Sequence, residues 1–349
     1  MQAILVTPGQ SRSAMLGEVP EPPLQDGDVL VQVLAIGVCG TDHEIVDGLY
    51  GTAPPGRDRL VLGHESIGRV MQAPEGAAIV PGDLVVGIVR EPDPVPCSSC
   101  AVGEWDMCRN GRYQEHGIKE RDGFARQRFR TTDDRLVRVD PKLGFLGVLL
   151  EPCSILGKAW EQIERIGTRT HWAPRRVLVT GAGPIGLLAA LLGRQRGFEV
   201  HVLDRVVDGP KPELVKALGA QYHTGSVDAL CREADIVVEC TGAGRLVWEV
   251  MTTAGAAGGI VCLTGVSSSG SKSKIDLGAL NRELVLENTV VFGTVNANRR
   301  HYTSAADALA QADRAWLEQL ITRKVPSPRW SEALVRQVHD VKTVIEFAA

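Results

Sequence analysis

The order of hydrophobic and polar residues divides the chain into two patterns. From residue 1 to about 140, short runs rich in branched residues alternate with turns of glycine, proline and aspartate. The strand-like runs cover residues 29–36, 66–71, 84–89 and 124–129. This pattern predicts a compact β-rich domain that is antiparallel or barrel-like.

From about residue 157, strand-like and helix-like segments alternate. Residues 177–180 and 199–203 predict strands, and residues 184–196 between them predict a helix that ends at Gly197. A helix is expected at 210–218, and further strands near Tyr222 and at 235–240, 259–263 and 289–293. Six strands alternating with helices predict an α/β fold with a doubly wound sheet.

The tail leaves this alternation at about residue 296. Residues 305–322 predict a helix and 343–347 a late strand, and we expect both to return to the first domain. Residues 267–273, which contain five serines, predict a short flexible loop. The expected domains are therefore 1–156 with 296–349, and a dinucleotide-binding Rossmann domain at 157–295.

A glycine-rich turn joins the first strand and helix of the second pattern. It reads Gly181-Ala-Gly183-Pro184-Ile185-Gly186. The first glycine permits a sharp turn, the second lets the backbone approach a pyrophosphate, and the third lets helix and strand pack closely. The helix start, with Pro184 and Ile185, then offers unpaired N–H groups to the phosphates. A tight turn without any ligand is the alternative.

An acid follows the second strand at the distance that such a site requires. Asp204 can accept hydrogen bonds from the ribose hydroxyls of NAD, and its charge opposes the 2′-phosphate of NADP. Arg205 instead favours NADP if its guanidinium pairs with that phosphate or stacks on adenine. The alternative is that Arg205 is a solvated surface residue. We expect NAD to be preferred and NADP to be used less well. Loops after later strands should rim the cofactor crevice, with candidate contacts at Thr241, Gly242 and Thr264.

Composition narrows the function classes. The chain has 349 residues, 44% of them hydrophobic, and a formal net charge of −4, which argues against nucleic acid or an anionic membrane as partner. The apolar run at 187–192 is too short to span a bilayer. The first residues show no basic and apolar signal pattern, so we expect a cytoplasmic protein whose eight cysteines are reduced thiols or metal ligands.

Three short motifs in the first domain carry metal-ligand chemistry. Cys39 follows a strand, the His64-Glu65 pair precedes another, and Glu151 ends the β-rich part. A thiolate, an imidazole and carboxylates can hold zinc while leaving a position open for substrate. Each motif is weak alone, and His64 by itself also fits a hydrogen-bonded structural histidine.

The order of these motifs ahead of the Rossmann unit resembles the zinc-dependent medium-chain alcohol and polyol dehydrogenases, and within them the microbial glucose 1-dehydrogenase branch. The resemblance covers nearly the whole chain and rests on Cys39-Gly-Thr-Asp-His-Glu-Ile-Val, Gly63-His-Glu, Glu115-His-Gly-Ile-Lys, Asp122-Gly-Phe, Leu150-Glu-Pro and Gly293-Thr-Val-Asn-Ala-Asn. It implies a GroES-like catalytic domain beside the six-stranded Rossmann domain.

The same resemblance implies roles for individual residues. Cys39, His64 and Glu151 correspond to zinc ligands, and Glu65 to a neighbouring or alternating ligand. Thr41 matches the hydroxyl that passes on the substrate proton, although it also fits a simple turn hydroxyl.

Substrate contacts follow in the same way. Glu115, Glu151 and Asn296 correspond to residues that contact sugar hydroxyls, and Asn296 also lies near the cofactor. Glu115 alternatively fits a solvated surface acid. The implied reaction transfers hydride from C1 of an aldose to NAD(P)+ and gives the lactone. A polyol or secondary-alcohol dehydrogenase is the alternative enzyme, and a non-catalytic dinucleotide-binding sensor the alternative class.

The family often carries a second, structural zinc held by four cysteines. Here Cys97, Cys100 and Cys108 supply three, Pro94 stands in place of the first, and Asp93 or a nearby acid is expected to complete the set. Three free thiols in an empty loop are the alternative. The resemblance also implies a homo-oligomer, a dimer or tetramer, with sheets joined through the strand near Val290.

Overall fold

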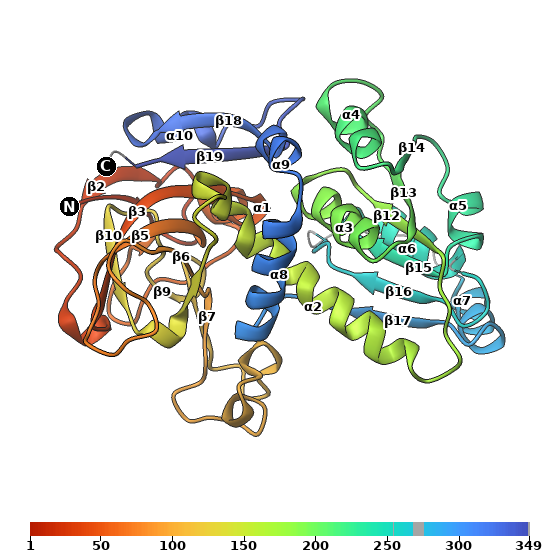
Figure 1. Cartoon of the computed structure of the whole chain (residues 1–349), viewed down its shortest axis with the longest axis horizontal. Helices are drawn as coiled ribbons and strands as arrows, with labels where there is room; N and C mark the ends of the chain where they lie inside the picture. The colour runs from red at the N-terminus through yellow and green to blue at the C-terminus, as the bar shows by residue number, and fades with distance from the viewer. Residues whose placement is uncertain (254, 268–275, 348–349) are drawn as a thin grey trace. The chain divides into compact units, whose positions relative to one another are not determined.

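The computed structural model describes residues 1–253, 255–267 and 276–347 (Figure 1). The chain forms two compact units, Met1–Ser154 with Asn296–Ala349, and Ile155–Val295. The change between them falls within α2 (Leu150–Gly167), and the boundary expected after residue 156 falls in the same helix. Apart from Ser267, the serine-rich loop expected at 267–273 lies outside the described residues.

The first unit is built on a seven-stranded sheet in the order β11-β6-β5-β3-β19-β18, with β10 also paired to β3. Two three-stranded sheets accompany it, β2-β1-β4 and β7-β8-β9. The bounds are β1 (Gln2–Val6), β2 (Met15–Glu18), β3 (Val29–Val38), α1 (Gly40–Val46), β4 (Leu60–Val61), β5 (Glu65–Gln72), β6 (Leu84–Gly87), β7 (Arg90–Glu91), β8 (Gln114–His116), β9 (Glu120–Arg121), β10 (Arg128–Thr131) and β11 (Leu136–Arg138). The predicted β-rich domain is confirmed.

β3 is the central strand of this unit because it pairs with β5, β10 and β19. Its first six residues alternate between buried and half-buried, and the last four are all buried. Alternation is typical of a strand with one covered face, and continuous burial of a strand covered on both. The strand therefore ends inside the unit, where Cys39 follows it.

One predicted strand is displaced along the sequence. Residues 124–129 were expected to form a strand, but β10 covers Arg128–Thr131. The backbone N–H groups of Phe124 and Ala125 instead donate to the Gly63 and Leu62 carbonyls, both at 2.8 Å. These residues thus pair beside β4 before the chain enters the large sheet.

The expected helix at 305–322 is wrong as a single element. The structure has α8 (Arg299–Gln311), α9 (Arg314–Leu320) and β18 (Ile321–Pro326). Ala312 is extended, and the Asp313 side chain accepts a hydrogen bond from Ala315 N at 2.8 Å, which starts a new helix. α10 (Trp330–Ala333) and β19 (Lys342–Glu346) follow, and β19 runs antiparallel to β3 and parallel to β18.

The second unit contains a six-stranded parallel sheet in the order β14-β13-β12-β15-β16-β17. The bounds are β12 (Arg176–Thr180), α3 (Pro184–Gln195), β13 (Glu199–Leu203), α4 (Pro210–Ala217), β14 (Gln221–His223), α5 (Asp228–Arg232), β15 (Ile236–Glu239), α6 (Gly244–Thr253), β16 (Ile260–Leu263), α7 (Leu277–Leu286) and β17 (Val290–Gly293). The predicted doubly wound sheet is confirmed. Its strand order reverses between β12 and β15, where such sheets bind ligands beyond their carboxyl ends.

The helices give no indication of a membrane span. Within the residues that the structure describes, none is long and apolar enough to cross a bilayer.

Candidate functional site

A cluster of potential metal ligands lies where β3 and β5 pair. Cys39 is the N-cap of α1, and its Sγ is 3.0 Å from His64 Nε2. Glu65, the first residue of β5, lies opposite Gly37 of β3. One ligand atom from each of Cys39, His64 and Glu65 lies within 4.8 Å of the other two. The structure therefore brings together three of the predicted ligands from segments that are distant in sequence.

Asp42 orients this cluster and was missed as a site residue. Its carboxylate accepts a hydrogen bond from Cys39 N at 2.9 Å and lies 3.5 Å from His64 Nδ1. Burial lowers the pKa of His64, but the Cys39 sulfur and the Asp42 carboxylate outweigh it and raise that pKa well above its usual value. A carboxylate behind the histidine directs Nε2 towards the metal position. The Cys-x-x-Asp spacing of the helix cap was the available sequence signal.

Lys342 is a second residue that the sequence did not reveal. It is 1% exposed, forms an ion pair with Glu65, and donates to Val38 O at 3.1 Å. Burial lowers the pKa of a lysine, but the Glu65 carboxylate raises that of Lys342 above its ordinary value. A Cβ on Gly37 would collide with the Glu65 carboxylate, so this glycine lets the pair lie against β3.

Glu151 lies in the first turn of α2 and is buried. It is not one of the three residues of the compact cluster, but the charges of His64 and Glu65 act on its carboxyl group. Burial, together with the nearby Glu65 carboxylate, raises the pKa of Glu151 to about 7. Thr41, half-buried in the first turn of α1, donates its backbone N–H to Cys39 Sγ at 3.3 Å.

The donor set tests which metal would fit. A thiol, an imidazole and a carboxylate converge, with His64 and Glu65 buried and Cys39 half-buried. Zinc accepts sulfur, nitrogen and oxygen donors in this combination. The residues present therefore fit zinc, with Cys39, His64 and Glu65 as ligands and Glu151 as the additional acid.

Glu115 and Asn296, both predicted substrate contacts, meet in the same unit. Asn296 Nδ2 donates to Glu115 Oε1 at 2.7 Å, and both residues are buried. Asn296 has a left-handed backbone with φ of 63°, a conformation that asparagine tolerates better than most residues. The structure therefore contradicts the alternative of a solvated surface acid at Glu115.

Arg90 completes this polar group and was not predicted. Its Nε and Nη2 donate to Glu115 Oε1 at 3.1 and 2.9 Å, and its guanidinium stacks on the Tyr113 ring at 3.7 Å. Nη1 donates to Asp106 O at 3.1 Å, and Asn298 Nδ2 donates to Asp106 Oδ1 at 2.7 Å. Arg90 thus fixes the orientation of the Glu115 carboxylate.

In the second unit, the glycine turn has the geometry that its sequence predicts. Gly181 has φ of 90°, and Gly183 is the N-cap of α3. A Cβ on Gly186 would collide with Gly181 O, whereas one on Gly183 would meet nothing within 4 Å. The second glycine therefore faces open space, where backbone can approach a ligand. Pro184 is the first residue of α3 and Ile185 the second.

Asp204 lies beside this turn, but its oxygens are engaged by protein groups. It accepts hydrogen bonds from Ala182 N at 2.7 Å and Val206 N at 3.0 Å, and lies 3.4 Å from Lys211 Nζ. Burial raises its pKa, but these donors outweigh burial and lower the pKa of Asp204. Lys211, seven residues further along the chain, therefore places a positive charge against the Asp204 carboxylate. Arg205 is exposed.

The predicted rim residues follow two adjacent strands. Thr241 and Gly242 follow β15 after a single residue, Cys240, and Thr264 comes directly after β16. Backbone or side-chain atoms of all three are hydrogen-bonded to Glu239, the last residue of β15.

Comparison with known proteins agrees with this geometry. Residues 25–141 match the alcohol dehydrogenase GroES-like domain, and residues 144–347 match the glucose dehydrogenase C-terminus. A glucose 1-dehydrogenase of Methanocella arvoryzae is 38% identical over 360 residues, covering 100% of both chains. The chain belongs to the glucose dehydrogenase branch of the zinc-dependent medium-chain dehydrogenases.

Two further members of the glucose dehydrogenase branch match along their full length. A glucose 1-dehydrogenase of Thermoproteus tenax is 40% identical over 352 residues, covering 99% of both chains. The solved structure of Haloferax mediterranei glucose dehydrogenase, in complex with NADP, Zn and gluconolactone, superimposes with a TM-score of 0.92 at 32% identity and covers 100% of both chains.

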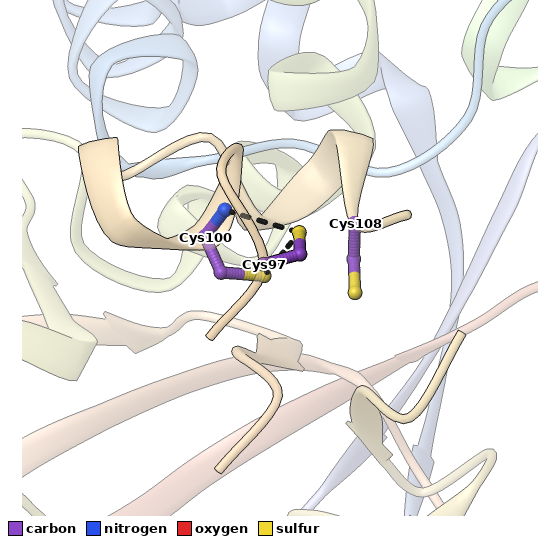
Figure 2. A group of neighbouring side chains, drawn as sticks. All are labelled: Cys97, Cys100 and Cys108. Carbon is purple, nitrogen blue, oxygen red and sulfur yellow. Dashed lines mark hydrogen bonds between the residues drawn. The ribbon is translucent and has the colours of Figure 1, made fainter. Parts of the chain in front are cut away.

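In the chain described here, Cys97, Cys100 and Cys108 form a second cluster, in the loop that precedes β8 (Figure 2). Cys97 Sγ and Cys100 Sγ are 3.6 Å apart, and Cys108 Sγ lies within 4.8 Å of both. Cys97 Sγ accepts hydrogen bonds from the backbone N–H groups of Arg109 and Cys100. These bonds stabilise the thiolate and lower the pKa of Cys97 to about 6. A readily formed thiolate beside two further sulfurs fits a thiophilic metal.

Asp93 lies near this loop, but its carboxylate is directed elsewhere. It accepts from Val95 N and Asn110 Nδ2, both at 2.8 Å, and from Arg112 Nε at 3.3 Å. Asp93 is not one of the residues of the cysteine cluster. Its contacts therefore support a role in shaping the loop, and its role as the fourth ligand stays a prediction.

We expect metal analysis of the purified protein to return about two equivalents of zinc per chain, one for each cluster. Cys97→Ser should lower the unfolding temperature by several degrees and change kcat little, because such a site chiefly folds its own loop. One equivalent, with all three thiols alkylated in the native protein, would rule out the second site.

Proposed function

We propose that this chain is a zinc-dependent dehydrogenase that oxidises an aldose such as glucose at C1, giving the lactone and NAD(P)H. The observation that carries the proposal is the end-to-end match to the Haloferax enzyme, whose solved structure holds NADP, zinc and gluconolactone together. The donor cluster and the glycine turn of this chain supply a place for the metal and for the dinucleotide.

The cluster residues hold and orient the metal. Zinc in such a site acts as a Lewis acid that polarises the substrate oxygen. Cys39, His64 and Glu65 are its proposed ligands, and Asp42 and Lys342 fix the orientation of His64 and Glu65. The Thr41 hydroxyl is the proposed relay that takes up the substrate proton while passing its own on towards solvent, and its helix turn is anchored on Cys39.

Glu115 and Asn296 are the proposed sugar-binding pair. Arg90 and Asn296 both bind Glu115 Oε1, which leaves the carboxylate in a fixed position for a hydroxyl group of the substrate. Buried polar groups reject ligands that leave them unpaired. This arrangement favours a polyhydroxylated substrate over a simple alcohol.

Activity on a substrate panel tests the proposal. The protein should reduce NAD(P)+ faster with glucose, xylose or galactose than with ethanol or butanediol, by at least about tenfold in kcat/KM. Fast turnover of polyols or secondary alcohols without sugar activity would support the alternative enzyme class. Cofactor binding without turnover of any substrate would support a sensor.

Cofactor choice depends on Asp204. We expect both cofactors to be used with NAD ahead, because the Asp204 carboxylate opposes a 2′-phosphate while Lys211 at 3.4 Å offsets part of its charge. In Asp204→Asn, kcat/KM for NADP relative to kcat/KM for NAD should rise by about tenfold, the effect of roughly one close charge interaction. Asp208→Asn removes the same charge from an exposed position nearby and should leave the ratio unchanged. A wild-type preference for NADP that Asp204→Asn does not alter would show that Asp204 does not face the ribose.

A homo-oligomer is proposed through the end strand of the parallel sheet. β17 is one end of the six-stranded order, and its first three residues are only half-buried. An end strand offers backbone groups to a second copy.

A cytoplasmic location is proposed because the reaction needs an intracellular nicotinamide pool and none of the eight cysteines forms a disulfide bond.

A further inference from the structure

A fully buried carboxylate lies beneath the rim of the dinucleotide crevice. Glu239 is the last residue of β15 and is 0% exposed. Its side chain accepts hydrogen bonds from Thr241 N at 2.7 Å, Gly242 N at 3.2 Å and Thr180 Oγ1 at 3.3 Å, and from the Thr241 hydroxyl. These donors come from the ends of β12 and β15, the two strands between which the sheet order reverses.

The main chain of the same residue binds the next loop. Glu239 O accepts hydrogen bonds from Thr264 Oγ1 at 2.8 Å, Thr264 N at 2.9 Å and Gly265 N at 3.1 Å. Glu239 therefore joins three segments at the carboxyl edge of the sheet: the end of β12, the loop after β15 and the loop after β16.

Close packing holds these segments against each other and against the glycine turn. A Cβ on Gly181 would lie 2.8 Å from Thr241 Cγ2, and one on Gly265 would lie 2.7 Å from Glu239 Oε2. A Cβ on Gly242 would collide with Val266 O. Thr241, held by Glu239, thus lies directly against the first glycine of the turn, so a shift of the carboxylate would disturb the loop after β15 and the glycine turn together.

We propose that Glu239 is a positioning residue of the cofactor site: its carboxylate fixes the Thr241–Gly242 backbone, and its main-chain carbonyl the Thr264–Gly265 backbone, in the geometry that receives the dinucleotide. The inference rests on the proposed function only in taking the ligand to be a nicotinamide dinucleotide. Glu239 itself does not line the crevice, because it is fully buried. The backbone N–H groups of Thr241 and Gly242 each need an acceptor oxygen, and the two oxygens of the Glu239 carboxylate supply one to each.

Glu239→Gln is the direct test, since glutamine keeps the size but replaces one acceptor oxygen with an NH2 group that faces these donors. The Kd for NADH and NADPH, from fluorescence titration, should rise by about tenfold, the equivalent of one lost hydrogen bond to a charged group. In steady-state kinetics, KM for the cofactor should rise while KM for the sugar stays unchanged.

Asp235→Asn is the matched control. Asp235 Oδ2 also accepts two backbone N–H groups, from Arg175 at 2.7 Å and Arg176 at 2.9 Å, but at the opposite, amino end of β12 and β15. This variant should lower the unfolding temperature to a similar extent and leave the cofactor Kd unchanged. If both variants weaken cofactor binding equally, the effect is general loss of stability and the inference is overturned.

An unchanged Kd in Glu239→Gln would also overturn it. If that variant does not fold, Thr180→Val replaces a hydroxyl donor that is fully buried and lies outside the predicted rim with a methyl group of the same size, and its Kd should rise severalfold or the inference fails. Absence of cofactor binding by the wild-type protein would instead contradict the proposed function, so the two failures are distinguishable.

Discussion

Replacing Cys39 with alanine is expected to lower kcat for sugar oxidation by about a thousandfold or more, because a lost Lewis acid removes several kcal/mol of transition-state stabilisation. Cys39 Sγ lies 3.0 Å from His64 Nε2 in a buried cluster, so its removal leaves the remaining donors without their thiolate. The zinc content should fall in parallel. NADH binding should stay near the wild-type value, because the glycine turn belongs to the other unit.

Cys231→Ala is a matched control for this variant. Cys231 is also a cysteine, is fully buried, packs in the core of the second unit and belongs to neither metal cluster. It should lose some stability and keep both zinc and turnover. Near-normal turnover of a metal-free Cys39→Ala preparation would contradict the proposed zinc chemistry.

Arg90→Met is expected to lower kcat/KM for glucose by about a hundredfold, the equivalent of roughly 3 kcal/mol for a buried carboxylate that loses its cation. Arg90 donates twice to Glu115 Oε1 and once to Asp106 O, so the substitution frees the carboxylate to turn away from the substrate. Most of the loss should be an increase in KM for the sugar, with little change in KM for the cofactor. Arg90→Lys should retain more of the wild-type kcat/KM for glucose than Arg90→Met but not all of it, because an ammonium group lacks the paired donors of a guanidinium.

The control for this variant is Arg323→Met. Arg323 is also largely buried, and it donates to the Glu332 and Val335 carbonyls and to Asp340, all at 2.7 Å. Its loss should destabilise the same unit without raising KM for the sugar. Equal KM values for glucose in Arg90→Met and the wild-type protein would show that Glu115 does not contact the substrate.

Features carried by local sequence were predicted well. The glycine turn is specified within a few residues, because its requirements are local: Gly181 has a left-handed backbone, and a Cβ on Gly186 would collide with Gly181 O. The strand at 199–203 was placed correctly, since its branched run lies between Gly197 and Asp204. The six strands of the second unit and the helices at 184–196 and 210–218 followed for the same reason, whereas α5, α6 and α7 were not predicted individually.

Residues whose role depends on a distant partner were missed. Lys342 lies 304 positions from Val38, whose carbonyl it binds, and nothing near it in sequence resembles a metal site. Arg90 is separated by 25 positions from Glu115 and looks like an ordinary strand residue beside a turn. A sequence pattern reports which side chains are available, whereas pairing across a sheet decides which of them meet.

The broken helix of the tail illustrates a local conflict. Residues 305–322 have the composition of one helix, but Asp313 caps a second helix, and β-branched Ile321 and Thr322 continue into β18. Parallel pairing of β18 with β19 outweighs the helical preference of this stretch.

The position of β19 has a consequence for how the protein is made. This strand carries Lys342 and lies between β3 and β18, although the whole second unit separates it from β3 in the chain. Domains generally fold in order as they leave the ribosome. Here the sheet around β3 is completed only after the nucleotide-binding unit has been translated, because that unit precedes β19 in the chain. The cation that balances the Glu65 carboxylate is therefore translated after the whole second unit, and we expect the Glu65–Lys342 ion pair to form later than the β3–β5 pairing that brings Cys39 and Glu65 together.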